Sequence, residues 1–449
     1  MEPDFKGSEI KELIKEQKWH DLRQVLREWP APDIAERLPD LEKKERVFVF
    51  RLLPRPLSSE VFSYLESKQQ DELLRDMTDE EMRLLLSNLS PDDRTQFLEE
   101  LPGQATQRLL NLLSFEDRRK TLQLLGYPEE SVGRLMTPDY VAIRPEWTVE
   151  QALGHIRNKG KDSETINVIY VVDPSWKLID GLELRRFIIA QPSQTVEQIM
   201  DHTFVSISAF EDREKAVQMI QHYDLDALPV VDSDGILLGI VTVDDVMDVA
   251  EEEVTEDFQK AAAVMPLKMG YRDSSIWLLY RRRIVWLGGL VLVNLVSAGV
   301  LAAHEELLIS SIALAFFIPL LIATGGNAGA QSATLMVRAI ATGELHLGEW
   351  SWAISREIGV GALLGMTIGL ATWGLGLFKG GGEIGIVVGL TMIAVVIASN
   401  LIGVVLPFLL TRLRLDPAVA SSPLITSVAD VVGLIIYFSI ATRILGAWR

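Results

Sequence analysis

Five long stretches near the C-terminal end carry no charge apart from a single aspartate. They cover residues 284–303, 307–337, 358–378, 384–411 and 417–442. Each is about 20 residues or longer, the length that an α-helix needs to cross the ~30 Å hydrocarbon core of a bilayer. The residues before about 275 are densely charged instead. The chain is therefore predicted to be a multidomain membrane protein that ends in five transmembrane helices.

The single aspartate, Asp430, lies in the middle of the last stretch. A carboxylate at membrane depth is unfavourable by a few kcal/mol or more, so it normally faces a partner or a water-filled path. The second stretch contains Pro319, several glycines, and the amides Asn327 and Gln331. Such breaks in a span are tolerated where protein or a wet cavity covers them, and ion sites form there. Close helix packing by small residues is the alternative, and it suits Gly361, Gly365 and Gly369 better than the two amides.

Arginines are concentrated on one side of the first four stretches. They are Arg281, Arg282 and Arg283 before the first stretch, Arg338 and Arg356 after the second, and Arg412 and Arg414 after the fourth. The opposite connections carry residues 304–306 (HEE) and 379–383 (KGGGE). The positive-inside rule then places the polar N-terminal part in the cytoplasm and the C-terminus outside. Five spans is an odd number for a self-contained transporter, which favours a homodimer with a pore on its symmetry axis.

The formal net charge of -19 resides almost wholly before residue 275. Such an acidic region disfavours nucleic acid as a partner, because nucleic acid requires clustered Lys and Arg. Cysteine is absent, which excludes disulfides and thiolate metal sites and leaves oxygen ligands suited to Mg²⁺ or Ca²⁺. The six histidines are scattered, and no catalytic nucleophile, phosphate-binding loop or ATP-hydrolysis motif is evident. The sequence therefore indicates a cation-binding protein that is not an enzyme.

A twelve-residue repeat occupies the region from about 50 to 126. Its apolar positions are Leu53, Leu65, Met77, Leu89, Leu101, Leu113 and Leu125. Capping and first-turn residues follow several of them, as in Thr78-Asp-Glu-Glu81 and Ser90-Pro-Asp-Asp93. The pattern predicts short helices of roughly ten residues, stacked as an all-α superhelix.

A second repeat follows from Met136 onward. Each copy reads as a short strand, a helix, two apolar strands joined by a turn that contains Asp173 or Asp232, and another helix. This duplication resembles a tandem pair of α/β CBS domains, and such pairs usually sense adenine nucleotides or ions. The second copy has Thr242 and Asp245 where that family contacts phosphate and ribose. The first copy has Leu184 and Phe187 there, so any ATP site is expected to be single.

An acidic run, DDVMDVAEEEVTED, occupies residues 244–257 and contains no basic residue. Asp245, Asp248, Glu252 and Glu256 fall on nearly one stripe of a helix. Two carboxylates about 5 Å apart repel by roughly 3 kcal/mol at an effective dielectric near 20. Divalent cations would neutralise that repulsion and favour a compact state. A solvated helix face is the alternative. The run leads into an amphipathic helix expected to connect to the first span.

The motifs GGNAGAQSATL, SNLIGVVLPFLL and DPAVASSPLITSVAD, behind a helical domain and a CBS pair, resemble the MgtE family of bacterial magnesium transporters. The resemblance covers the whole chain and implies a homodimeric Mg²⁺ channel in the bacterial inner membrane. It implies Asp430 as the pore carboxylate and Asp416 as one at the cytoplasmic mouth. It also implies a set of Mg²⁺-sensing residues: Asp224, Asp245, Asp248, Glu253, Glu256 and Asp257. Some relatives carry asparagine where this chain has Ala330 and Ser422.

We therefore predict a passive Mg²⁺ channel that closes when cytoplasmic Mg²⁺ occupies the acidic sites. The expected domains are a helical domain over 1–130, tandem CBS domains over 131–251, a connecting helix over 252–276 and a pore domain over 277–449. Transport of another divalent ion such as Co²⁺ or Mn²⁺ is one alternative. A membrane-anchored sensor that carries nothing is the other.

Overall fold

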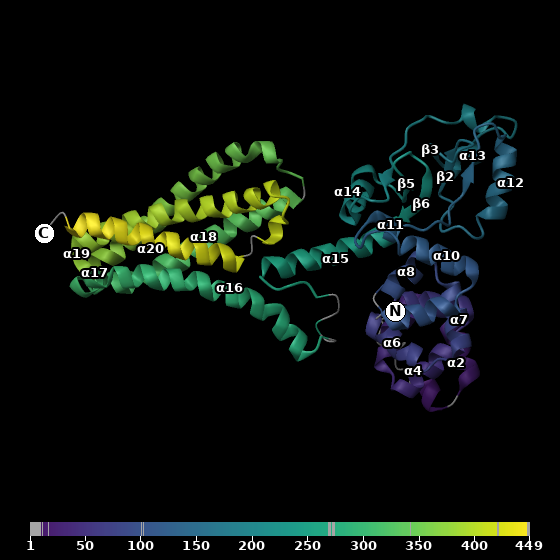
Figure 1. The fold of residues 1–449 in the computed structure, drawn as a ribbon, viewed down its shortest axis with the longest axis horizontal. Coiled ribbons are helices and arrows are strands. Elements are labelled where there is room, and N and C mark those ends of the chain that lie inside the picture. The colour runs from purple at the N-terminus through teal and green to yellow at the C-terminus, as the bar shows by residue number, and fades with distance from the viewer. Residues whose placement is uncertain are drawn as a thin grey trace. The chain divides into compact units, whose positions relative to one another are not determined.

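The computed structural model describes residues 10, 12–16, 18–99, 101, 103–267, 271, 274–341, 343–419 and 422–446. The chain forms two compact units, Met1–Glu252 and Glu253–Arg449. The first unit contains a helical array followed by two small α/β repeats, and the second is almost entirely helical (Figure 1).

The helical array has the predicted twelve-residue spacing. After α2 (Trp19–Glu28) and α3 (Ala31–Arg37) come α4 (Lys43–Leu52), α5 (Arg55–Ser63), α6 (Ser67–Arg75), α7 (Asp79–Asn88), α8 (Pro91–Glu99), α9 (Gly103–Leu112) and α10 (Phe115–Leu124). Thr78 and Glu81 form the reciprocal cap that starts α7, and Ser90 Oγ accepts a hydrogen bond from the Asp93 N–H at 3.3 Å. The repeated apolar residues end the helices, and Leu53, Leu65, Leu89 and Leu113 are buried in the core. The prediction of a series of short helices is confirmed.

The two α/β repeats have matching topology. The first consists of β1 (Ala142–Ile143), α12 (Val149–Lys159), β2 (Val168–Val172), β3 (Leu178–Glu183) and α13 (Leu184–Ile189). The second consists of β4 (Ile207–Ser208), α14 (Arg213–Tyr223), β5 (Ala227–Val231), β6 (Leu237–Thr242) and α15 (Val243–Ala261). In each sheet the first strand is parallel to the second and the third is antiparallel to it.

The Asp-containing turns form as predicted. Asp173 Oδ1 accepts hydrogen bonds from the N–H groups of Ser175 and Lys177. Asp232 Oδ1 accepts the equivalent pair from Asp234 and Ile236. These Asx-type turns fix the hairpin that joins the two long strands of each repeat.

The connecting helix predicted over 252–276 differs from the structure. Helix α15 begins in the second repeat at Val243 and ends at Ala261. Ala263 then takes a left-handed φ of 57°, and Pro266 further disfavours helical backbone at Met265. Gln259 Oε1 accepts the Leu267 N–H at 2.7 Å and holds the turn. Residues 268–270 and 272–273 lie outside the described residues.

The membrane-type unit consists of α16 (Ile276–Ala303), α17 (Glu305–Ser310), α18 (Ala313–Ala341), α19 (Trp350–Arg412) and α20 (Ser422–Gly446). Within the described residues, four helices are long and apolar enough to cross a bilayer, rather than the five predicted. The difference lies in α19, whose 63 residues join two predicted stretches.

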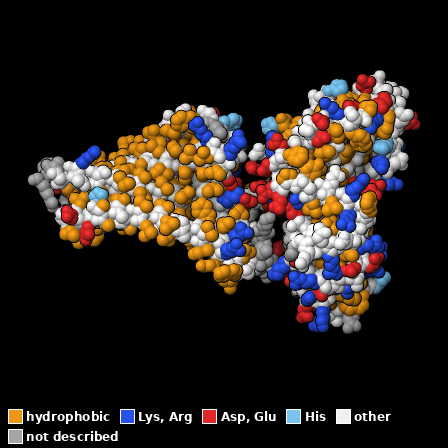
Figure 2. Space-filling model, viewed as in Figure 1, with side chains coloured by type: hydrophobic (Ala, Val, Ile, Leu, Met, Phe, Trp, Pro, Cys, Tyr) orange, Lys and Arg blue, Asp and Glu red, His pale blue; other side chains and the backbone are white. Residues whose placement is uncertain are grey.

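Helix α19 is broken at Gly381, where φ is 82° and ψ is -174°. Its two parts then pack together, since a Cβ on Gly376 would lie 2.6 Å from the Cα of Gly385. Gly361, Gly365 and Gly369 face residues of the other part at similarly close range, as the packing interpretation predicted. The visible surface of this unit is mostly hydrophobic, with charged side chains toward its ends (Figure 2).

Candidate ion-binding sites

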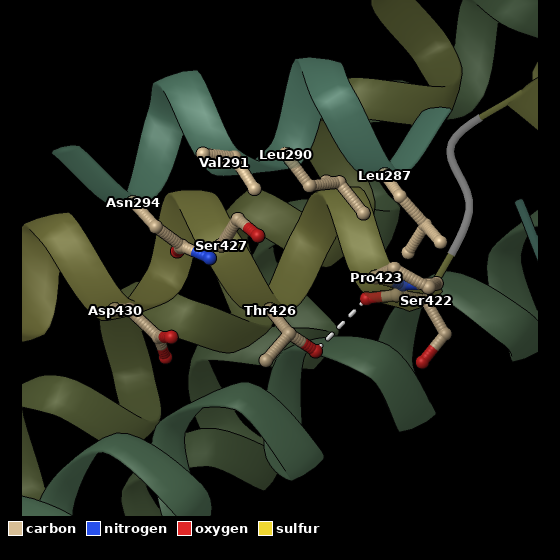
Figure 3. Close-up of a pocket in the computed structure, with 9 residues that line it drawn as sticks. All are labelled: Leu287, Leu290, Val291, Asn294, Ser422, Pro423, Thr426, Ser427 and Asp430. Carbon is tan, nitrogen blue, oxygen red and sulfur yellow. Dashed lines mark hydrogen bonds between the residues drawn. The ribbon is translucent and has the colours of Figure 1, made fainter. Parts of the chain in front are cut away.

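Asp430 lies on α20 and lines a cavity of about 450 Å³ between α16 and α20 (Figure 3). The other lining residues are Leu287, Leu290, Val291, Asn294, Ser422, Pro423, Thr426 and Ser427. Asn294 from α16 and Ser427 from α20 point into the space between the two helices. Asp430 follows Ser427 by three residues, so polar groups continue along this side of α20.

The carboxylate of Asp430 is half-buried, and its Oδ1 atom has no hydrogen-bond partner among the described residues. An unpaired buried carboxylate oxygen is unfavourable by about 1–3 kcal/mol or more. A site that receives a hydrated cation removes that penalty. The structure therefore offers a free oxygen ligand at the residue that the sequence singled out.

The two amides on α18 lie elsewhere on this unit's surface. Asn327 and Gln331 are exposed and one helical turn apart, and neither lines the Asp430 cavity. Their segment nevertheless crosses α20 closely, because Gly326 packs against Thr426, one turn before Asp430. Sequence reasoning missed Asn294, although an amide within an otherwise apolar stretch was the available signal.

In the first unit, carboxylates from three places in the sequence gather around the start of α15. They are Asp92 and Asp93 on α8, Glu164 after α12, and Asp244, Asp245 and Asp248 on α15. We call this group the cytosolic acidic cluster. The sequence run from 244 to 257 revealed only the α15 members. Asp92, Asp93 and Glu164 are distant from this run in the sequence, and no sequence pattern predicted that they would join the α15 carboxylates.

Burial and mutual repulsion perturb this cluster. Burial, followed by the charge of Asp245, holds the pKa of Asp92 well above its usual range. Burial raises the pKa of Asp245 to about 7, although the hydrogen bond from Thr242 Oγ1 at 2.6 Å acts in the opposite direction. Asp92 is only 6% exposed, and its Oδ1 has no hydrogen-bond partner in the described part of the chain. The cluster therefore gathers buried carboxyl groups and leaves one of their oxygens without a hydrogen bond.

The other predicted sensing residues are not members of this cluster. Asp224 ends α14 in a left-handed conformation, and Glu252 pairs with Arg213 at 2.8 Å. Glu253 also has an interaction partner. Glu256, Asp257 and Asp416 lie together in the second unit around Lys260. Across the described residues, no three acidic or histidine side chains are arranged to hold a metal ion.

Three family models match separate parts of the chain. The model for divalent cation transporters matches residues 318–440, that for the MgtE intracellular N domain matches 29–130, and that for the CBS domain matches 132–182 and 196–252. A magnesium transporter MgtE from Thermus thermophilus is 40% identical over 98% of both chains. The chain belongs to the MgtE family. A magnesium transporter MgtE from Bacillus subtilis is 35% identical over 72% of this chain and 72% of that one.

Solved structures support the MgtE assignment for the first unit. The cytosolic domain of the Mg²⁺ channel MgtE in complex with ATP is 38% identical, with a TM-score of 0.52 over 54% of this chain and 99% of that one. The soluble part of a magnesium transporter is 28% identical, with a TM-score of 0.53 over 56% of this chain and 99% of that one. These relatives are transporters rather than enzymes, and this chain is a member of a magnesium-transporter family.

Proposed function

We propose that this chain forms a homodimeric channel through which Mg²⁺ enters the cytoplasm passively. The observation that carries the proposal is the unpaired, buried Oδ1 of Asp430, in a membrane-length helix whose residues 422–442 carry no other charge. Mg²⁺ releases its water reluctantly, so carboxylate and amide oxygens would grip a hydrated ion. An inside-negative potential contributes roughly 4–5 kcal/mol per 100 mV to the entry of a divalent cation.

The proposed pore uses one Asp430 from each subunit, with Asn327, Gln331 and Asp416 contacting the ion or its waters. The two parts of α19 would cross the bacterial inner membrane separately, giving five crossings in all. The arginines at 281–283, 338, 356, 412 and 414 would then face the cytoplasm with the first unit, and the C-terminus would lie outside.

Flux into liposomes tests the pore. With an inside-negative potential and a Mg²⁺-sensitive dye, the wild type should take up Mg²⁺, whereas Asp430→Asn should lose at least about 90% of the rate, equivalent to more than 1.4 kcal/mol. Glu305→Gln, an exposed carboxylate outside the cavity, is the control and should behave as the wild type. Undiminished uptake by Asp430→Asn would refute the pore assignment. Parallel runs with Co²⁺ and Mn²⁺ determine whether another divalent ion is preferred.

We further propose that cytoplasmic Mg²⁺ closes the channel by binding the acidic side chains along and around α15. Asp92 and Asp245 carry this part of the proposal, because one has a free buried oxygen and both are held near one another at raised pKa. A divalent ion bound only in the compact arrangement would stabilise that arrangement in proportion to its concentration.

Recordings with Mg²⁺ varied on the cytoplasmic face test this gating. The triple variant Asp92→Asn, Asp245→Asn, Asp248→Asn should stay open at millimolar Mg²⁺ that closes the wild type. Asp162→Asn changes an exposed loop carboxylate and should close normally. If the triple variant closes at the same concentration as the wild type, the cytosolic acidic cluster is not the sensor.

ATP is proposed to bind the second CBS repeat through Thr242 and Asp245. The support is the cytosolic MgtE structure in complex with ATP and the proximity of the two side chains, joined by a 2.6 Å hydrogen bond. Calorimetric titration of the full-length protein with ATP should show one site per chain in the wild type. Thr242→Val should weaken it by about tenfold, the loss of one charge-assisted hydrogen bond. Equal affinity for both proteins would exclude this position.

A further inference from the structure

Lys260, in the last turn of α15, lies among carboxylates of the second unit. Its Nζ atom pairs with Asp416 Oδ2 at 2.5 Å and with Glu256 one turn earlier on the same helix. Only 23% of the Lys260 side chain is exposed, which is unusual for lysine unless it is paired. Asp257 lies close enough to this pair for both charges to affect its pKa. Burial raises the pKa of Asp257 most, the charge of Asp416 raises it further, and the charge of Lys260 lowers it.

Asp416 divides its two oxygens between different partners. Oδ1 accepts the Ala418 N–H at 2.8 Å and thereby starts the short helix Pro417–Val419. Oδ2 receives the Lys260 ammonium. The Asp416 oxygen that could bind a metal cation, Oδ2, is thus occupied by the ammonium group of Lys260.

The Lys260 cluster consists of Glu256, Asp257, Asp416 and Lys260. Three carboxylates and one ammonium leave two negative charges uncompensated. The cluster therefore still attracts a divalent cation, but the nearest carboxylate oxygens are engaged by lysine. Burial lowers the pKa of Lys260, and the hydrogen bonds to Asp416 and Glu256 raise it by more, so the ammonium stays charged.

We propose that Lys260 is a tethered competitor for Mg²⁺, which must displace the ammonium before it can bind Glu256, Asp257 and Asp416. This inference rests on the proposed gating, and it identifies Lys260 as the residue that sets the Mg²⁺ concentration at which the channel closes. A divalent ion and an ammonium cannot share the same carboxylate oxygens without strong mutual repulsion. While Mg²⁺ is scarce, the lysine neutralises part of the cluster and joins α15 to the segment before α20. When Mg²⁺ is abundant, the ion replaces it.

Competition fixes the direction of the effect. Without the ammonium, the carboxylates should fill with Mg²⁺ at a lower concentration, and the channel should close earlier. A lysine that merely clamps the closed state would give the opposite result, because its loss would require more Mg²⁺ for closure. The sign of the shift therefore separates the two roles.

The experiment measures the cytoplasmic Mg²⁺ concentration that half-closes the full-length channel in excised patches. Lys260→Met keeps the length of the side chain and removes the charge, and its half-closing concentration should fall by about tenfold. Lys260→Arg keeps the charge and should stay within about twofold of the wild type. Lys161→Met removes an exposed charge from the first repeat and should not shift closure.

A double variant checks that the lysine acts through Asp416. In the Asp416→Asn background the Lys260→Met shift should shrink to less than about threefold, because the shared oxygen no longer carries the charge for which the cations compete. An unshifted or upward-shifted Lys260→Met, beside a wild type that closes normally, would overturn this inference alone. A wild type that never closes with Mg²⁺ would overturn the gating and this inference together.

Discussion

At the scale of single residues, the two units share one feature. Asp92 in the first unit and Asp430 in the second each hold a buried oxygen without a hydrogen-bond partner in the described part of the chain. A stable protein normally pairs such atoms. Both are carboxylates, whose unpaired oxygens suit a hard cation. Among the buried unpaired atoms of the described residues, these two are the carboxylate oxygens, and both belong to proposed ion sites.

Asp245 makes the cytosolic acidic cluster sensitive to pH. Burial raises its pKa to about 7 in the folded protein, whereas an unfolded aspartate titrates near 3.9. The folded state therefore binds more protons between these values. The contribution of Asp245 to stability without Mg²⁺ is full below about pH 4 and is lost as the pH rises through 7. Limited proteolysis of the full-length protein in chelator should be slower at pH 6 than at pH 8, by about tenfold or less.

Two comparisons check this pH dependence. Asp245→Asn should flatten it, because the amide does not titrate, and Mg²⁺ at pH 8 should restore the protection of the wild type. Equal cleavage of the wild type at both pH values, in the absence of Mg²⁺, would contradict the raised pKa of Asp245.

At the scale of elements, a polar contact joins α18 to both parts of α19. Glu357 Oε2 accepts hydrogen bonds from Ser332 Oγ at 3.1 Å and from Asn400 Nδ2 at 3.0 Å. Ser332 and Asn400 are buried. The helices approach closely here, since a Cβ on Gly403 would collide with the carbonyl of Gly329. One carboxylate thus holds together the helices that support α20.

Removing this carboxylate should loosen the bundle. Glu357→Leu leaves the buried Asn400 Nδ2 donor without this acceptor, at about 1–3 kcal/mol, whereas Ser332 Oγ keeps the Asn400 carbonyl as an acceptor at 3.2 Å. The change should lower the melting temperature of the detergent-solubilised protein by a few degrees. Glu357→Gln keeps an acceptor oxygen and should lose about 1 kcal/mol or less. If both variants melt alike, the two hydrogen bonds contribute no stability and the contact is incidental.

The sequence predicted elements with a regular pattern and missed those set by long-range contacts. The spacing from Leu53 to Leu125 located the short helices, and the duplicated motifs located both sheets. No periodicity could reveal that Asp92 would meet Asp245, because the two are far apart in the chain. Lys260 was within reach, since it follows Glu256 by four residues, the usual helical pair spacing. The acidic run itself ends at Asp257, so the pattern did not include this lysine.

For the assembled protein, the proposed homodimer would cover polar groups that the second unit exposes in a single chain. Helix α16 has no buried side chain among its described residues, and α18 exposes the amides of Asn327 and Gln331 one turn apart. Lipid suits the apolar face of α16 but not the two amides. A second copy related by a twofold axis would cover the amide face and place both Asn327 residues near that axis.

Cysteine cross-linking tests this arrangement cleanly, because the chain contains no cysteine of its own. In liposomes, Asn327→Cys treated with a bismaleimide should yield a covalent dimer, and dilution of the protein in lipid should not reduce the yield. Leu363→Cys, on a 66% exposed apolar position of α19, should cross-link only through collisions and should respond to dilution. Equal yields at both positions would place Asn327 away from any symmetry axis. The proposed pore requires the α18 segment beside Asp430 to face the same segment of the second subunit. Equal yields would therefore also contradict a homodimeric ion route.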